Sequence, residues 1–266
     1  MSGSPAPCPR SVIVTRLRAA GCVFAEDEAR LLISTAATPA DLAVMLDRRV
    51  AGTPLEHVLG WVQFCDLRIA VDPDVFVPRR RTEFLVHQAA ALTRHAIGPA
   101  GQARTRPRTV VVDLCCGSGA VGAALIVALD RVELHAVDLD PAAVRCARRN
   151  LTGAGGRVYE GDLYGPLPAT LRGRVDVLVA NAPYVPTEAV GLLPPEARLH
   201  EPQLALDGGA DGLDVLRRVV AAAPLWLAPG GHLLVETGRR QALHIVETVA
   251  RTGLIPQVAS SDEHNA

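Results

Sequence analysis

The sequence contains no lysine, so all 27 of its basic side chains are arginine. This absence excludes a lysine Schiff base, a lysine general base and the lysine of a P-loop. Neither sign of charge is in excess, because 28 acidic side chains oppose the arginines and the formal net charge is −1. Aromatic residues are also few, at 3%. Neither an overall field nor an aromatic and basic groove therefore favours nucleic acid as a direct ligand, or an anionic membrane.

Cysteine pairs at metal-binding or redox spacing are missing as well. None of the six cysteines forms a C-x-x-C pair, and the first residues do not combine a basic flank with an apolar core. A reduced, cytoplasmic setting is the economical interpretation. The run from 219 to 235 lacks Asp, Glu and Arg, but its prolines and glycines divide it into a helix end, a turn and a strand. We therefore predict no membrane span.

Apolar material is plentiful, since 49% of the 266 residues are hydrophobic, and it suffices for a substantial core. Residues 11 to 50 carry apolar positions at helical spacing. Two extended segments, 64–71 and 75–77, surround Asp72-Pro73-Asp74 and predict a hairpin-like connector. The sequence therefore starts with a small helical part that a connector joins to the rest.

Strand and helix patterns alternate with regularity after residue 108. The predicted strands are 109–114, 132–137, 157–160, 175–180, 232–236 and 254–258. The predicted helices are 119–129, 141–150, 212–222 and 240–252, and a further helix over 82–95 is predicted ahead of this alternation. The stretch 98–108, rich in Pro, Gly and Arg, is predicted as an exposed loop. This alternation predicts an α/β fold with a mostly parallel sheet, helices on both faces, and ligands at the carboxyl ends of the strands.

A glycine-rich motif, Asp113-Leu-Cys-Cys-Gly-Ser-Gly119, lies between the first strand and the first helix of this alternation. Its glycines let the backbone turn tightly beneath a ligand, while the next helix presents free N–H groups. The run from 117 to 122 also matches G-x-G-x-x-G, and Asp138 follows Gly117 by 21 residues, where a ribose-binding acid would lie. This motif alone leaves a dinucleotide and S-adenosylmethionine both open.

Acidic residues lie at the ends of three strands, and the first of them tilts the choice between the two cofactors, whereas Asp138 suits either. Asp113 precedes the glycine turn, where a carboxylate would attract an ammonium group and repel a pyrophosphate, which favours S-adenosylmethionine. Asp138 can accept from both ribose hydroxyls, and Asp162 could border the adenine; capping and turn roles are the alternatives. The predicted cofactor-binding residues are Asp113, Cys115, Cys116, Gly117, Ser118, Gly119, Asp138, Leu139, Asp162, Leu163 and Asn181.

The motif Asn181-Ala-Pro-Tyr184 directly follows the fourth strand. Asn-Pro-Pro-Tyr at this place is typical of class I methyltransferases that act on planar nitrogen, and the chain resembles the HemK/PrmC-type protein-(glutamine-N5) methyltransferases from about residue 10 to 260. Further segments carry the resemblance: Pro54-Leu-Glu-His-Val-Leu-Gly60, Gln63-Phe64, Phe76-Val-Pro-Arg-Arg-Arg-Thr-Glu83 and Glu201-Pro-Gln-Leu-Ala-Leu-Asp-Gly-Gly-Ala-Asp-Gly-Leu213.

The resemblance implies a Rossmann-like catalytic domain that uses S-adenosylmethionine, no metal, and methylates a glutamine of a protein, above all a peptide chain release factor. It also implies a helical substrate-docking domain over 1–55, ahead of the connector and methyltransferase domain over 56–266. The implied catalytic residues are Asn181, Ala182, Pro183 and Tyr184. The implied substrate-binding residues are Arg79, Thr82, Glu83, Asn181 and Tyr184.

The chemistry agrees with these roles. An amide nitrogen is a weak nucleophile, and the Asn181 side-chain oxygen and the carbonyl of residue 182 could each accept one of its N–H groups, while Tyr184 packs on the flat amide. Orientation of this kind supplies roughly 7 to 11 kcal/mol in favourable cases, so no strong base is required.

Four features depart from the family pattern. Ala182 replaces the first proline, and Cys115 replaces the first glycine of the cofactor loop. Arg80 and Arg81 stand where the family has proline and an acid, and they suggest an anionic substrate or a solvated turn. The family's final antiparallel strand is expected to be missing or truncated after the predicted strand at 254–258.

These features leave other interpretations open. One is a methyltransferase for a planar nitrogen of nucleic acid or of a small molecule. Another is a cofactor-binding module of low activity, and a third is a nicotinamide-dependent oxidoreductase. A metal or redox role for the adjacent Cys115 and Cys116 is a further alternative to their being small loop residues.

Overall fold

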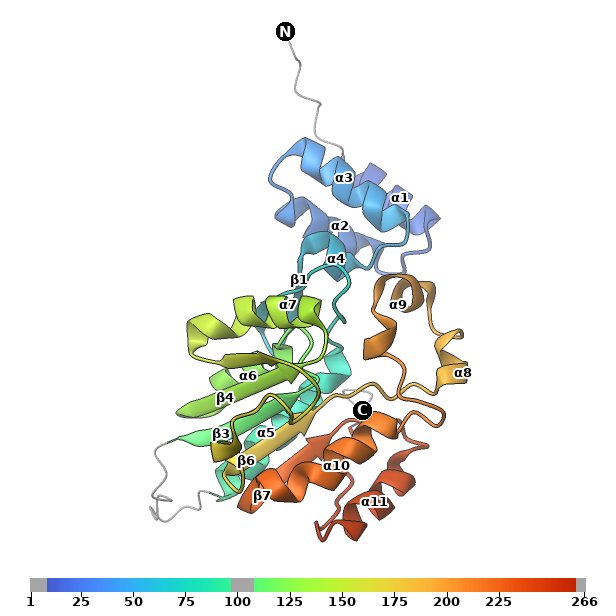
Figure 1. The fold of residues 1–266 in the computed structure, drawn as a ribbon. Helices are drawn as coiled ribbons and strands as arrows, with labels where there is room; N and C mark the ends of the chain where they lie inside the picture. Colours follow the sequence, from blue (N-terminus) through green and yellow to red (C-terminus); the bar gives the residue numbers. More distant parts are fainter. Residues whose placement is uncertain (1–8, 97–107, 262–266) are drawn as a thin grey trace.

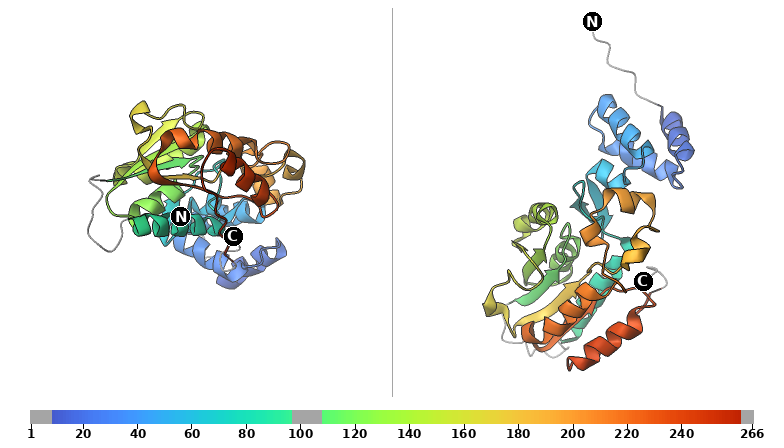
Figure 2. Two further views of the ribbon diagram at one scale, coloured as in Figure 1. Left: turned by 90° about the horizontal axis from the view of Figure 1, so that it is seen from below. Right: turned by 45° about the vertical axis from the view of Figure 1, so that its right-hand side comes forward.

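The computed structural model describes residues 9–96 and 108–261. It begins with the helices α1 (Arg10–Ala19), α2 (Ala25–Thr35), α3 (Pro39–Val50) and α4 (Leu55–Leu59). Thr38 caps α3 by accepting a hydrogen bond from the Asp41 N–H at 3.1 Å, and Pro39 opens the first turn. The four helices bury one apolar cluster of Leu, Ile, Val and Ala side chains. They lie together at one end of the molecule, with the sheet toward the other (Figures 1 and 2).

An antiparallel hairpin follows, made of β1 (Trp61–Phe64) and β2 (Leu67–Ala70). The connector is thus a hairpin, but its strands are joined at Cys65 and Asp66. The predicted turn at Asp72-Pro73-Asp74 is present, with the Val75 N–H donating to the Asp72 carbonyl at 3.3 Å, but it follows the hairpin instead of closing it. Both residues have positive φ, 46° and 61°, as the two-residue turns that match the twist of a hairpin require. The Cys65 N–H donates to Glu83 Oε1 at 3.2 Å, so a residue from a later helix helps to hold this turn.

The second part of the fold is a five-stranded parallel sheet with the order β5-β4-β3-β6-β7. Its strands are β3 (Thr109–Leu114), β4 (Val132–Asp138), β5 (Arg157–Glu160), β6 (Val175–Ala180) and β7 (Leu227–Val235). Its longer helices are α5 (Glu83–Ala96), α6 (Ala120–Ala128), α7 (Pro141–Leu151), α10 (Asp214–Trp226) and α11 (Ala242–Arg251). The remaining short elements are η1 (Arg80–Thr82), η2 (Thr152–Ala154), η3 (Ala169–Leu171), α8 (Thr187–Val190), α9 (Pro195–His200) and η4 (Gln203–Ala205).

Helices cover both faces of this sheet, as the alternation predicted. Along β3, Val111 packs into the cluster that α5 and α6 share, whereas Val110 and Val112 pack with α10 residues such as Val219 and Trp226. This period of two sends successive side chains to opposite faces. Because both faces are buried, β3 is a continuous apolar run, and its bounds coincide with the prediction from the sequence.

The carboxyl-terminal part differs from the prediction in two places. The α10 helix continues through Pro224 to Trp226, and β7 begins at Leu227 rather than at His232. The predicted strand at 254–258 is wrong, because no strand is assigned between 254 and 261. Leu254 packs against the core cluster on one face of the sheet, but Ile255 and Val258 are exposed and cover no sheet face.

The predicted loop at 98–108 lies, apart from its last residue, outside the described residues. No helix in the ranges 9–96 and 108–261 is both long and apolar enough to cross a membrane.

The segment from 181 to 213 joins β6 to α10 and carries α8, α9 and η4. Arg49 of α3 ties this segment to the N-terminal helices. Its Nη1 donates to Glu196 of α9 at 2.6 Å, and its Nε donates to Glu28 of α2 at 2.6 Å. The side chains of Arg49 and Glu28 are 9% and 10% exposed, whereas that of Glu196 is 48% exposed. The two ion pairs of Arg49 therefore link the two parts of the fold from a buried anchor in the N-terminal helices to a half-exposed residue of α9.

Candidate active site

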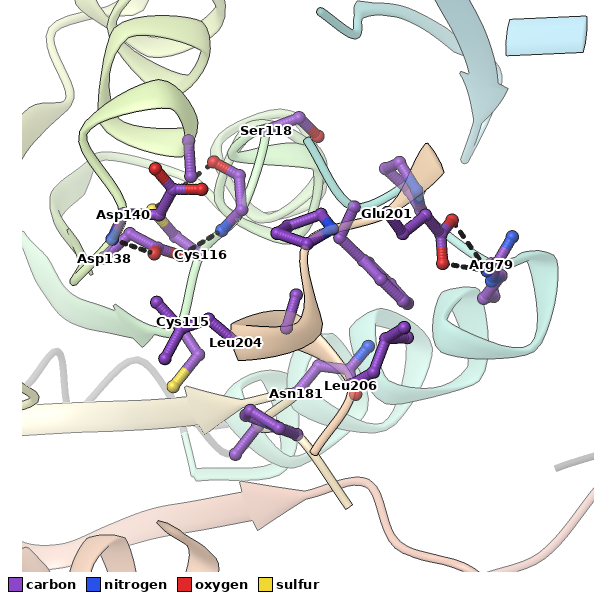
Figure 3. A pocket seen from close by; sticks show the side chains of 18 of the residues that line it. Arg79, Cys115, Cys116, Ser118, Asp138, Asp140, Asn181, Glu201, Leu204 and Leu206 are labelled. Atoms are coloured by element: carbon purple, nitrogen blue, oxygen red, sulfur yellow. Dashed lines mark hydrogen bonds and ion pairs between the residues drawn. The ribbon is translucent and has the colours of Figure 1, made fainter. Parts of the chain in front are cut away.

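A cavity of about 600 Å³ lies at the carboxyl ends of β3, β4 and β6, and the segment that carries α9 lines it as well. It collects the predicted site residues with two exceptions, Gly119 and Glu83. Figure 3 shows residues of the cofactor loop, Asp138 and Asn181 at the ends of strands, and residues of the 181–213 segment around it. Arg81 and Thr82 of the η1 turn also line the cavity. The residues expected to bind cofactor and those expected to bind acceptor thus share one space.

The three glycines of the loop have different surroundings. Gly117 has φ +54° and open space where a Cβ would stand, so the backbone itself faces the cavity there. A Cβ on Gly119 would lie 2.8 Å from a Leu151 methyl group, and one on Gly122 would lie 2.9 Å from Leu134. Gly119 and Gly122 therefore permit close packing of the loop and α6 against neighbouring elements, while Gly117 is the position that offers room to a ligand.

Asp113 and Asp138 are held by backbone N–H groups. Asp113 is 2% exposed and accepts from the Gly122 N–H at 3.0 Å. Burial raises the pKa of this carboxyl to about 7, opposed by that hydrogen bond and assisted by repulsion from Asp138. Asp138 accepts from the N–H groups of Gly117 at 2.7 Å and Asp140 at 2.9 Å. Burial also raises the pKa of Asp138, against these hydrogen bonds.

Three further features of the loop bear on a cofactor. Ser118 is 1% exposed, lines the cavity, and its hydroxyl has no hydrogen-bond partner among the described residues. Cys115 adopts φ +55°, a left-handed conformation that is unfavourable for a residue with a side chain. Asp162 forms an ion pair with Arg218 of α10. Acidic acceptors, an unpartnered hydroxyl and a glycine without steric neighbours together fit a cationic, hydroxyl-bearing group such as S-adenosylmethionine.

The acceptor end of the cavity is organised by side chains from three separate segments. The Asn181 Nδ2 donates to the Thr82 hydroxyl at 3.2 Å, and that hydroxyl donates to Glu236 Oε2 at 2.7 Å. The other carboxylate oxygen of Glu236 accepts from Arg81 Nε at 3.0 Å and from the Tyr184 hydroxyl at 3.3 Å. Arg81 also donates to the Tyr184 hydroxyl, and its guanidinium lies 5.9 Å from the centre of that ring.

Two predicted substrate-binding residues make internal contacts. Arg79 donates through Nη2 to both oxygens of Glu201, at 2.7 and 2.6 Å, and the Glu201 side chain is almost fully buried. Burial raises the pKa of Glu201, while Arg79 and the Val77 N–H oppose the shift. Glu83 lies away from the cavity, with its carboxylate on the hairpin turn. Both residues therefore hold the connector in place beside the site.

Sequence reasoning did not select Glu236 or Arg218, and it noted Arg81 only as a departure from a family pattern. Glu236 directly follows β7, at the edge of the sheet where Asn181 follows β6 and Asp138 ends β4. The rule that ligands bind at the carboxyl ends of parallel strands could have found it. Arg218 lies on α10 and carries no comparable signal.

The parallel sheet, the acidic strand ends and the Asn181 to Tyr184 loop define a class I S-adenosylmethionine-dependent methyltransferase. Residues 102–193 match the family model described as "Methyltransferase small domain". The chain is 38% identical, over 84% of its length and 75% of the relative's, to the release factor glutamine methyltransferase of Geobacter sulfurreducens. The chain therefore belongs to the release factor glutamine methyltransferase family.

Two other proteins show the breadth of the similarity. The chain is 36% identical to the 4-amino-L-phenylalanine/4-methylamino-L-phenylalanine methyltransferase of Streptomyces pristinaespiralis, over 77% of this chain and 68% of that one. Among solved structures, the hMettl16 catalytic domain in complex with the MAT2A 3′UTR hairpin 6 superposes with a TM-score of 0.50 at 16% identity, over 82% of this chain and 75% of that chain. This second likeness concerns the fold alone.

Proposed function

We propose that this chain transfers the methyl group of S-adenosylmethionine to the side-chain amide nitrogen of a glutamine in a peptide chain release factor. The observation that carries the proposal is the orientation of Asn181 at the cavity. Its amide nitrogen donates a hydrogen bond to the Thr82 hydroxyl, which leaves the amide oxygen as the end that can accept an N–H group from a substrate. Membership of the family supports glutamine as the source of that N–H group.

We assign the loop side of the cavity to the cofactor. Asp138 would accept from ribose hydroxyls, Asp113 would face the ammonium group, and the Ser118 hydroxyl would gain a partner. Asp162, Leu139 and the loop residues 115–117 line the same side. When bound, S-adenosylmethionine supplies an electrophilic methyl group on a sulfonium centre.

We assign the other side to the acceptor amide. The Asn181 oxygen and the carbonyl of Ala182 would each accept one N–H group, which fixes the plane of the amide and aims its nitrogen. Tyr184 would pack on that plane, and Pro183 restrains the loop between them. Because the amide nitrogen loses its proton only as the new bond forms, positioning is the main contribution required of these residues.

The protein substrate needs a larger surface than the cavity. We propose that the helical domain over residues 1–55 docks the release factor, while the part over 56–266 carries the chemistry. Arg49, which joins α3 to α9, would keep the docking surface in register with the cavity. A cytoplasmic location, where release factors act, stays a prediction.

The test is methylation of purified release factors that carry Gly-Gly-Gln, with labelled S-adenosylmethionine. Mass spectrometry should place one methyl group on that glutamine, and a release factor with alanine in its place should remain unlabelled. The Asn181→Ala variant is the matched enzyme control and should bind the cofactor without turnover. Intact cofactor binding by the wild type with no label on glutamine would overturn the substrate assignment.

A second acceptor class has one observation in its favour, the similarity to the methyltransferase for 4-amino-L-phenylalanine. The same assay with 4-amino-L-phenylalanine, and with RNA and DNA, separates these classes. Faster turnover of any of them than of the release factor would replace the leading proposal.

A further inference from the structure

The hydrogen bonds around Glu236 leave only one consistent assignment of protons. A carboxylate accepts hydrogen bonds and donates none, so the Thr82 hydroxyl must give its single proton to Glu236 Oε2, at 2.7 Å. The Thr82 oxygen can then only accept. Asn181 must therefore present its NH2 group to Thr82, at 3.2 Å, and turn its oxygen away.

We propose that Glu236 is a positioning residue for methyl transfer, acting through Thr82 to decide which end of the Asn181 amide is offered to the acceptor. The proposal rests on the proposed function for the identity of the acceptor. We call the two hydrogen bonds from Asn181 to Thr82 and from Thr82 to Glu236 the relay. The two ends of the Asn181 amide are nearly equal in shape, so without the relay the amide could flip and present N–H groups to a substrate that itself donates N–H groups. The relay therefore fixes the amide oxygen as the end that faces the acceptor.

The surroundings of the relay fix its geometry. Thr82 is 2% exposed and the Glu236 side chain is 14% exposed, so water competes little for these hydrogen bonds. The Glu236 N–H donates to the Ala180 carbonyl at 3.3 Å, which continues the pairing of β6 with β7. Glu236 and Asn181 are therefore held side by side at the ends of adjacent strands, while Thr82 closes the relay from the η1 turn.

A second branch of the same carboxylate reaches Tyr184. Glu236 Oε1 accepts from the Tyr184 hydroxyl at 3.3 Å, and Arg81 bonds to both partners. The Tyr184 side chain is thus held by its hydroxyl, at the end of the side chain, while Tyr184 still lines the cavity. One carboxylate therefore orients the two side chains proposed to hold the acceptor amide, and Arg81 balances its charge.

The test uses substitutions that change hydrogen-bonding capacity and little else. Thr82→Val keeps the shape and removes the relay, Thr82→Ser keeps the hydroxyl, and Glu236→Gln keeps the shape but no longer dictates direction. The matched control is Thr93→Val, which removes another buried hydroxyl, bonded to the Ala89 carbonyl within α5. Thermal midpoints of Thr82→Val and Thr93→Val report any general cost of losing a buried hydroxyl.

Kinetics give the first readout. Thr82→Val is expected to lower kcat/KM by about 100-fold, mostly in kcat, because a misoriented contact at the reacting amide costs rate of this order. Glu236→Gln should lose less, since its amide oxygen can still face Thr82 in one of two orientations. Thr82→Ser should restore turnover, and all variants should bind S-adenosylhomocysteine as the wild type does.

A second readout needs no acceptor. The chain has three asparagines, Asn150, Asn181 and Asn265, so labelling asparagine with 15N yields three side-chain NH2 signals. The Asn181 pair should move toward the position of an unbonded amide in Thr82→Val and stay in Thr82→Ser. Asn150, which donates to the carbonyls of Ala70 and Ser118, is the internal reference.

The outcomes separate the inference from the proposed function. Unchanged Asn181 signals in Thr82→Val, or equal losses of turnover in Thr82→Ser and Thr82→Val, would overturn the relay. Should Thr82→Val fail to fold, Thr82→Ala removes the same hydroxyl without adding a methyl group, and an unaltered Asn181 signal in that variant would do the same. If the signals move as expected but no release factor is methylated, the relay stands and the acceptor assignment falls; kinetics are then measured on whichever acceptor the wild type methylates.

Discussion

The two halves of the cavity are built in different ways. On the cofactor side, Asp138 is held by N–H groups 21 and 2 residues away in sequence, and Asp113 by one 9 residues away. On the acceptor side, the bonds join side chains that are 99, 154 and 155 residues apart. The first half is therefore organised by local backbone, and the second by the packing of β6, β7 and the η1 turn against one another.

This difference predicts how each half responds to change. A carboxylate held by backbone N–H groups keeps its surroundings when a distant side chain is altered. A network of buried side chains loses more than one contact when one member is removed, because the remaining partners stay desolvated and unpaired. Substitutions should thus separate cofactor affinity from turnover.

The largest effect is expected for Asn181→Ala. Removing the amide takes away the acceptor for a substrate N–H group, and we expect kcat to fall by about 1,000-fold, the scale of losing one preorganised polar contact at a reacting group. Asn181 is also among the residues predicted to bind the cofactor, but its hydrogen bond to Thr82 places it with the acceptor side. The affinity for S-adenosylmethionine, measured by calorimetry, should therefore remain within about twofold. A comparable loss of cofactor affinity would show that the two halves are not separable.

Asp113 offers a pH test on the cofactor side. Burial raises its folded-state pKa to about 7, above its ordinary value of 3.8. The folded chain therefore holds this proton where the unfolded chain has released it, so the free energy of unfolding should fall as pH rises from about 4 to 7, by about 1.4 kcal/mol per unit of pKa difference.

The Asp113→Asn variant keeps an acceptor for the Gly122 N–H and should lose this pH dependence. Denaturant titrations of the cofactor-free protein at pH 5 and pH 8 measure it. S-adenosylmethionine affinity should change in the opposite sense and increase with pH over the same range in the wild type, because only the ionised carboxylate attracts an ammonium group. Equal pH slopes for the wild type and Asp113→Asn would contradict the assignment.

Asp138→Asn should weaken cofactor binding while leaving the acceptor half intact. The amide can replace only part of the acceptor capacity that the carboxylate offers to the Gly117 and Asp140 N–H groups and to ribose hydroxyls. We expect the Kd for S-adenosylmethionine to increase by about 10-fold to 100-fold, the value of one or two charge-assisted hydrogen bonds. At saturating cofactor, kcat should recover most of its wild-type value. A loss of kcat that persists at saturating cofactor would show that the two halves of the cavity are coupled.

The same division explains what the sequence could predict. The strands β3 and β6 have the predicted bounds because each is an apolar run between turn residues. The short strand β5 also has them, because its Val-Tyr pair lies between Gly156 and Gly161. The cofactor loop was found because its glycines and acids are neighbours in sequence. Glu236 was missed because its partners, Thr82 and Tyr184, are far away in the chain.

Two of the departures from the predicted fold have similar causes. The strongest turn signal of the connector was Asp72-Pro73-Asp74, yet the chain reverses at Cys65 and Asp66, where Glu83 from α5 holds the turn. The segment at 254–258 has apolar residues at strand spacing, but Pro256 lacks an N–H group for a ladder. Tertiary contacts, or their absence, decided both cases.

The smallest expected effect tests whether the cofactor loop is held by backbone conformation. Cys115 has φ +55°, where a Cβ costs roughly 1 to 2 kcal/mol and a branched side chain more. Cys115→Gly should relieve this strain but lose the packing of the thiol against the two adjoining apolar clusters, so its stability should lie close to that of the wild type. Cys115→Val, which keeps the apolar volume and adds a branch at Cβ, should be less stable than Cys115→Gly by about 2 kcal/mol. Denaturant midpoints compare the two variants directly. If Cys115→Val were as stable as Cys115→Gly, the loop would not hold residue 115 in the left-handed conformation. The backbone of the cofactor loop would then be less rigid than the hydrogen bonds to Asp138 indicate.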